Sequence, residues 1–203
     1  MTAVILLMSI GQGAQDLILK QIQGLGSKTI VVVPGREPSG PSDFAQVFSD
    51  SLKEKDLEIL KRKENAPTIA RIMPLVFGGD NAAYGGETFR LTIFGATGLI
   101  SEIFDLYPDR GAMFTDDEVR SRSDVVIIGA KVKEELFGDS DALGQKIKVK
   151  GRNLKIIGIL PKKGQVSFFN FDEAALMPYT TAQEYIFGIK YFHRFIIEAD
   201  TEA

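Results

Sequence analysis

The sequence has no cysteine, no tryptophan and a single histidine, His193. Without cysteine, a disulfide, a thiolate nucleophile, a zinc ribbon and an iron–sulfur cluster are all excluded. One histidine cannot supply the imidazole pair of a common metal site, and a serine–histidine triad would have to use His193 itself. Because His193 lies in the alternating run Tyr191–Phe195, we interpret it as a strand residue rather than a base.

An excess of charge of one sign is also missing. The 203 residues include 24 Lys and Arg against 27 Asp and Glu, which gives a net charge of −3 and no reason to expect a nucleic-acid partner. With 44% hydrophobic and 25% charged residues, the chain has ordinary globular composition, enough for one medium domain or two small ones.

The motifs of nucleotide and serine chemistry are absent or incomplete. The P-loop pattern Gly-x-x-x-x-Gly-Lys-Ser/Thr does not occur, and no serine lies in a Gly-x-Ser-x-Gly elbow. Gly11 and Gly13 begin a dinucleotide fingerprint, but Asp16 occupies the third glycine position and would repel a pyrophosphate. We therefore predict no catalytic residue, no metal site and no cofactor, and favour binding or force transmission over catalysis.

The first ten residues are mostly apolar, and helical spacing of apolar residues continues after them, so one helix is predicted from about Ala3 to Gln23. The run is much shorter than the roughly 20 residues that cross a membrane. A helix that is apolar on all sides must be buried in protein or in lipid. It is therefore either part of a soluble core or the end of a membrane helix, and we expect the second.

Hydrophobic periodicity further along the chain predicts alternating strands and short helices, which is typical of an α/β or α+β fold. The predicted strands are Lys28–Val33, Thr68–Phe77, Phe89–Phe94, Asp124–Ile128, Lys146–Val149, Leu154–Leu160, Ala175–Pro178 and Tyr191–Ala199. The predicted helices are Ser51 to about Lys63, Thr97–Phe104, Ala130–Phe137 and Thr180–Phe187, the last of them capped by Thr180 or Thr181.

Three kinds of local signal refine these elements. Ser51 with Glu54, and Thr115 with Glu118, have the spacing of capping boxes at helix starts. The glycines of 78–79 and 85–86 are expected to flank a short polar strand in a hairpin-like arrangement. Pro74 indicates an edge or a bulge in its strand.

Two loops, 34–48 and 161–172, contain apolar side chains that either anchor the loop to the domain or contact a partner. Anchoring is the favoured interpretation for both. The candidate contact residues are Phe44, Val47 and Phe48 in the first loop, and Phe168, Phe169 and Phe171 in the second.

Short motifs along almost the whole chain, weak singly but specific in their order and spacing, resemble the extracytoplasmic core domain of MacB-type ABC transporter permeases. They are Ser9–Ile22, Leu25–Ser27, Thr29–Gly35, Tyr84–Gly86, Phe94–Thr97, Val126–Gly129, Glu135–Gly138, Leu143–Gln145, Ile156–Leu160 and Met177–Ala182. The Pro-rich loop 34–48 departs from the family, which does not conserve its length or composition.

The resemblance implies a two-lobed α+β fold. Residues 1–95 and 175–203 would form a βαβ lobe similar to the porter modules of drug efflux pumps, with residues 1–10 as the stub of the first transmembrane helix. Residues 96–174 would form a smaller mixed α/β lobe inserted within it. Gly11 and Gly13, near the membrane surface, would act as hinges or would allow close helix packing.

The resemblance also implies partners. The full subunit would have four membrane helices, work as a homodimer with a cytoplasmic ABC ATPase, and often bind a periplasmic adaptor. This domain would lie outside the cell membrane, in the periplasm or the extracellular space. It would couple ATP hydrolysis to the movement or export of a substrate.

Two other functions stay open from the sequence. The domain could be an extracytoplasmic signalling or scaffold domain that recruits a cell-wall hydrolase, as related permease-like proteins do. It could also be a soluble hydrolase with an unrecognised site, in which case His193→Ala would abolish its activity.

Overall fold

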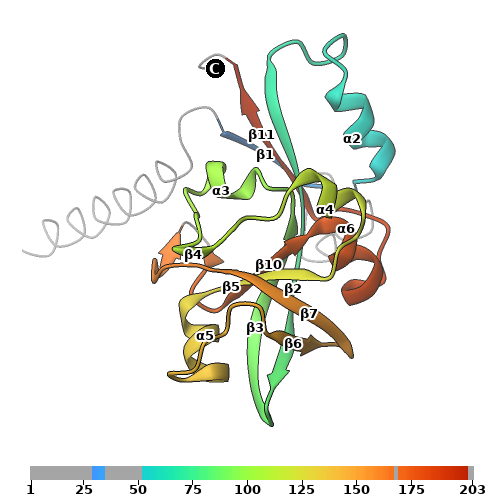
Figure 1. Cartoon of the computed structure of the whole chain (residues 1–203). Helices are drawn as coiled ribbons and strands as arrows, with labels where there is room; N and C mark the ends of the chain where they lie inside the picture. The colour runs from blue at the N-terminus through green and yellow to red at the C-terminus, as the bar shows by residue number, and fades with distance from the viewer. Residues whose placement is uncertain (1–28, 35–51, 167–168, 201–203) are drawn as a thin grey trace, which may run out of the picture.

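A computed structural model describes residues 29–34, 52–166 and 169–200, and these residues build a mixed sheet of nine strands with short helices on its surface (Figure 1). The sheet contains β1 (Thr29–Val32), β2 (Ile69–Tyr84), β3 (Glu87–Ala96), β4 (Arg110–Gly111), β5 (Val125–Ile128), β6 (Lys146–Val149), β7 (Arg152–Ile159), β10 (Ala174–Pro178) and β11 (Arg194–Ala199). The helices are α2 (Glu54–Lys61), α3 (Ile100–Ile103), α4 (Asp116–Arg120), α5 (Ala130–Phe137) and α6 (Tyr179–Thr181), which continues into the π-helix η2 (Ala182–Phe187).

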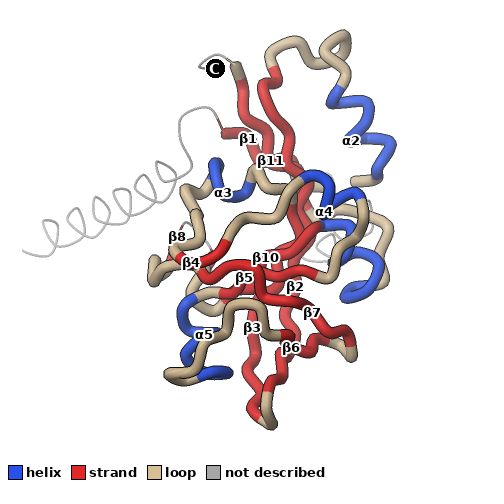
Figure 2. Tube along the Cα trace, in the orientation of Figure 1, coloured by secondary structure: helices blue, strands red, loops and turns tan. Residues whose placement is uncertain are grey.

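Six of the strands close into a barrel, in the order β2, β3, β10, β5, β7 and β6, and β6 pairs again with β2 (Figure 2). The β3/β10 and β5/β7 pairs are parallel, and the other four are antiparallel. The closing pairs are Ala82 with Val149 and Ala83 with Lys148. The mixed α and β class is confirmed, whereas the closed barrel was not predicted.

The first part of β2 leaves the barrel and pairs with β11, which in turn pairs with β1. We call β1, β11 and residues 69–75 of β2 the arm. Pairing of β2 with β3 begins only at Val76, so among the described strands Pro74 has β11 on one side and none on the other. The structure thus confirms the edge position that Pro74 indicated, since proline cannot donate to a second ladder.

The glycines at 78 and 79 do not break the strand, so the prediction of a separate polar strand between two glycine turns was wrong. Both glycines lie inside β2, where a Cβ at Gly78 would come within 2.7 Å of Phe187 Cε1. Glycine is present there because the end of η2 packs against the strand. Gly85 and Gly86, with φ of 58° and 96°, form the tight turn into β3.

Three predicted helix and strand ends also differ from the structure. Helix α2 begins after Lys53, whose N–H donates to the carboxylate of Asp56 at 2.8 Å, and Ser51 lies outside the described residues. Thr180 and Thr181 do not cap a helix; their hydroxyls donate to the carbonyls of Val119 and Ser123 at 2.5 and 2.9 Å. β11 begins only at Arg194. The box at Thr115 and Glu118 is confirmed.

The segment 96–174 leaves the barrel at the end of β3 and returns at β10, and these strands are adjacent and parallel, with Ala96 opposite Pro178. A segment inserted into another lobe must leave and re-enter that lobe at nearby points, and the end of β3 and the start of β10 meet this condition. Strands β5, β6 and β7 of this segment complete the barrel, so one closed sheet contains strands from both predicted lobes.

A buried carboxylate, Asp172, joins the 161–172 loop to the barrel. It is 8% exposed, and its Oδ1 accepts the backbone N–H groups of Lys163 and Gly164 at 2.8 and 2.9 Å. Its backbone carbonyl accepts the N–H of Lys131 at 3.0 Å, at the start of α5. One residue therefore holds both the loop and the helix.

Asp172→Ala should lower the free energy of unfolding by about 1–3 kcal/mol, because two part-buried N–H groups lose their charged acceptor. Asp172→Asn, which keeps an oxygen at this position, should cost less than half as much. Urea unfolding of the three proteins measures both values. Equal losses for Ala and Asn would contradict this role of the carboxylate.

Candidate functional site

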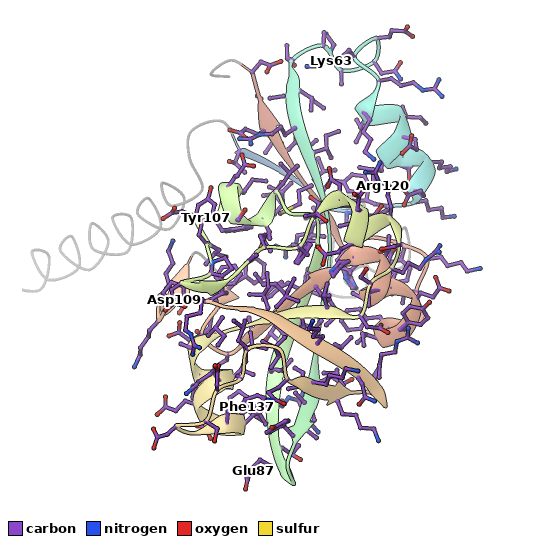
Figure 3. All side chains as sticks on the ribbon, viewed as in Figure 1. Lys63, Glu87, Tyr107, Asp109, Arg120 and Phe137 are labelled. Carbon is purple, nitrogen blue, oxygen red and sulfur yellow. The ribbon has the colours of Figure 1, made fainter. Side chains whose placement is uncertain are left out.

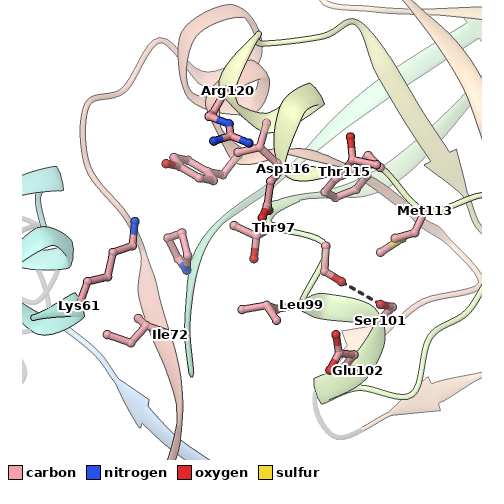
Figure 4. Close-up of a pocket in the computed structure, with 15 residues that line it drawn as sticks. Lys61, Ile72, Thr97, Leu99, Ser101, Glu102, Met113, Thr115, Asp116 and Arg120 are labelled. Carbon is pink, nitrogen blue, oxygen red and sulfur yellow. Dashed lines mark hydrogen bonds between the residues drawn. The ribbon is translucent and has the colours of Figure 1, made fainter. Parts of the chain in front are cut away.

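A groove of about 660 Å³ lies where the arm meets the barrel (Figure 4). Its walls come from α2, the arm part of β2, α3 with the turn before it, the segment before α4, α4 itself and Tyr179. The lining residues are Lys61, Ile72, Pro74, Thr97, Gly98, Leu99, Ser101, Glu102, Met113, Phe114, Thr115, Asp116, Val119, Arg120 and Tyr179. The groove exists only in the folded chain, because these elements are distant in sequence.

The groove has an apolar floor and a charged rim. Ile72, Phe114 and Val119 are at most 8% exposed and form part of the floor. Lys61 and Arg120 pair with Glu58 and Asp117 at 3.3 and 2.7 Å, in exposed ion pairs that are weak because water screens them. Side chains on this rim are therefore free to rearrange around a ligand or another protein.

Tyr179 separates this groove from a second one of similar volume, which is also lined by Glu54, Gln183 and Lys190. Burial, together with the nearby carboxylate of Glu54, raises the pKa of Tyr179 to about 12. Burial also raises the pKa of Glu54. Tyr179 is thus protonated at neutral pH and serves as a hydrogen-bond donor, not as a base.

The hydroxyl groups of Ser101 and Thr97 both lie near the first groove. Ser101 Oγ donates to the Gly98 carbonyl at 2.8 Å, and no imidazole or carboxylate approaches it among the described contacts. The Oγ1 atom of Thr97 is buried without a hydrogen-bond partner among the described residues. Within the same residues, no group of three His, Asp or Glu side chains could hold a metal ion, and no helix is long and apolar enough to cross a membrane.

His193 lines neither groove and lies beside the point where β2 passes from the arm into the barrel. Its Nδ1 accepts the backbone N–H of Phe77 at 3.0 Å, and its ring packs against the rings of Phe77 and Tyr191. Burial, and secondarily the charge of Arg194, lower the pKa of His193 below its ordinary value. A neutral imidazole with a backbone partner and aromatic neighbours is a structural group.

The structure describes two of the six candidate contact residues. Phe171 is 1% exposed, and Phe169 is half-buried, with its ring edge-on to Phe94 at 4.9 Å between centroids. Both rings therefore anchor their loop to the core. The other four candidate contacts and the two candidate hinges lie outside the described residues: Phe44, Val47, Phe48, Phe168, Gly11 and Gly13.

Sequence reasoning missed the groove entirely. Lys61, Arg120 and Tyr179 carry no motif, and their separation along the chain gives no sign that they meet.

Comparison with known proteins agrees with the fold. A family model described as MacB-like periplasmic core domain matches residues 1–203. The macrolide export ATP-binding/permease protein MacB of Neisseria gonorrhoeae is 29% identical over 187 residues, which is 92% of this chain and 28% of that protein. MacB of Wolinella succinogenes is 28% identical over 98% of this chain and 30% of that protein. The chain thus spans less than a third of these relatives.

Two solved structures share the fold. The periplasmic region of MacB from Actinobacillus actinomycetemcomitans superposes with a TM-score of 0.74 at 20% identity, covering 92% of this chain and 81% of that one. The extracellular domain of the ABC-type transporter YknZ from Gram-positive bacteria superposes with a TM-score of 0.67 at 21% identity, covering 85% and 84%.

The lowered pKa of His193 predicts a pH-dependent stability. Its contribution is fully present above the unfolded pKa of about 6.5 and is lost as pH falls through the lower folded pKa, because only the unfolded state binds the proton readily. The free energy of unfolding, measured with urea, should therefore fall less between pH 7.5 and pH 5.5 for His193→Asn than for the wild type. The asparagine keeps a hydrogen-bond acceptor but does not titrate. An unchanged difference would contradict this origin.

Proposed function

The chain belongs to the family of MacB-like periplasmic core domains, and on this premise we propose that it is the non-catalytic outer domain of an ABC permease subunit. The domain itself is periplasmic or extracellular. In this proposal it couples ATP hydrolysis in the cytoplasm to the movement or export of a substrate outside the membrane. The observation that carries the proposal is the family match over the whole chain, together with the shared fold.

The strand β2 supports a mechanical role, because one continuous run of 16 residues belongs to both the arm and the barrel. A displacement of the arm would reach the barrel through backbone hydrogen bonds rather than through a flexible linker. Arg71 of β2 reinforces the connection: it pairs with Glu198 of β11 and with Glu102 of α3, beside the groove. Movement of the arm would thus also change the width of the groove.

The partners in this proposal are a cytoplasmic ABC ATPase, a second copy of the subunit and, in some systems, a periplasmic adaptor. The names of the relatives, ATP-binding/permease proteins, support an ATPase part and a membrane part. Gly11 and Gly13 are proposed hinges, and loops 34–48 and 161–172 remain proposed contact regions. The division into lobes of residues 1–95 with 175–203, and 96–174, is part of the same proposal.

A scaffold domain that recruits a cell-wall hydrolase is the alternative, because the same fold and location would serve it equally well. The two functions differ in what the intact permease binds. Copurification of a cell-wall hydrolase, in the absence of an adaptor or a transported substrate, would favour the scaffold.

The coupling proposal predicts that ATP changes the distance between the two copies of the domain. The 203-residue sequence has no cysteine, and Lys190 is exposed. Lys190→Cys can therefore carry a single spin label in a permease from which any other cysteines have been removed. The label-to-label distance distribution should shift between the nucleotide-free and ATP-bound transporter. It should not shift when the ATPase cannot bind ATP. Identical distributions in all states would contradict coupling.

A further inference from the structure

A cluster of lysines covers the outer face of the β6–β7 hairpin. Residues 146–155 include five cationic side chains and no acidic one. Two of the five are neutralised: Lys150 pairs with Asp80 at 3.5 Å, and Arg152 pairs with Asp124 at 2.7 Å while stacking on Tyr185. The other three, Lys146, Lys148 and Lys155, are exposed and have no ion pair among the described residues. We call these three the basic triad.

The barrel fixes the direction in which the triad points. Ile147, Val149 and Leu154 are fully buried, so the alternating lysines between them must face outward. Lys146 and Lys155 are direct partners in the antiparallel register. Their Cβ atoms are therefore about 5 Å apart, and Lys148 lies about 7 Å further along β6.

This arrangement works against the stability of the domain. Like charges directly opposite each other in an antiparallel pair destabilise the sheet. The chain has more acidic than basic residues, yet it places no carboxylate against these three lysines within the described residues. An uncompensated positive cluster on an acidic protein indicates a surface that is completed by a negatively charged partner.

The shape of the surface indicates the kind of partner. Neither groove includes a residue of the triad, so no enclosed small ligand is expected there. Lysine presents a compact charge without the bidentate geometry of arginine, which suits a broad electrostatic contact. The triad lies on a flat hairpin, which fits the surface of another protein.

The position of the triad separates a protein from the membrane as its partner. Lys148 pairs with Ala83, next to the turn into Glu87, and Figure 3 shows Glu87 at the end of the molecule opposite Lys63. The described chain enters through β1 and leaves through β11, both in the arm at the other end of the sheet (Figure 1). If the proposed function is right, the membrane lies on the arm side and the triad faces away from it.

We propose that the basic triad docks an acidic surface of a soluble extracytoplasmic protein. The test uses the 203-residue chain and a fluorescein-labelled oligoglutamate peptide, with anisotropy measured from about 20 to 300 mM salt. Lys146→Glu/Lys148→Glu/Lys155→Glu should weaken binding tenfold or more at low salt. The control Lys53→Glu/Lys55→Glu/Arg62→Glu makes the same charge change at exposed positions that line neither groove, and it should stay within twofold of the wild type.

The proposal would be overturned if both triple variants weakened peptide binding equally, or if neither variant weakened it. Stronger binding to phosphatidylglycerol vesicles than to the peptide would also overturn it, in favour of a membrane surface. Neither readout involves ATP or transport. A failure of the coupling proposal therefore leaves this result unchanged, and the reverse also holds.

A single substitution separates binding from folding. Lys155→Glu replaces a like-charge pair with an opposite-charge pair across from Lys146, so it should raise the Tm of the chain while it weakens peptide binding. Lys55→Glu should leave peptide binding unchanged. A lowered Tm for Lys155→Glu, or peptide binding equal to that of the wild type, would refute the argument that these lysines are retained for a partner.

Discussion

The pairing of β6 with the far half of β2 is the constraint on which the rest of the structure depends. Ala82 and Val149, both fully buried, meet at this contact and turn an open mixed sheet into a closed barrel. Closure removes the free edges that six strands would otherwise expose, and it fixes which side of each strand faces the core. The outward direction of the lysines on β6 and β7 follows from it directly.

The length of β2 joins the arm to the barrel. Because one strand serves both the barrel and the arm, the two parts cannot move apart without breaking backbone hydrogen bonds, and the groove forms at the point where they diverge. His193 lies at the same transition and supplies an acceptor for the N–H of Phe77. The coupling role that we propose depends on this continuity between the arm and the barrel.

The described surface joins binding features with little catalytic chemistry. Hydroxyl groups near the grooves donate to backbone carbonyls, and the phenol of Tyr179 is held in its protonated form by burial. What remains available is a charged rim around an apolar floor, and a lysine cluster at the end of the barrel away from the arm. Both are features of recognition, in which surfaces meet without covalent change.

Local chemistry determined much of this protein: alternation located most strands, Gly85 and Gly86 predicted the turn between β2 and β3, and Thr115 with Glu118 predicted the start of α4. These signals act within a few residues, so the sequence carries them directly. The barrel, the groove and the roles of Gly78, Thr180 and His193 depend on contacts between distant segments. Only the tertiary structure decided them, because pairing across such separations depends on how the whole core packs, which no short pattern encodes.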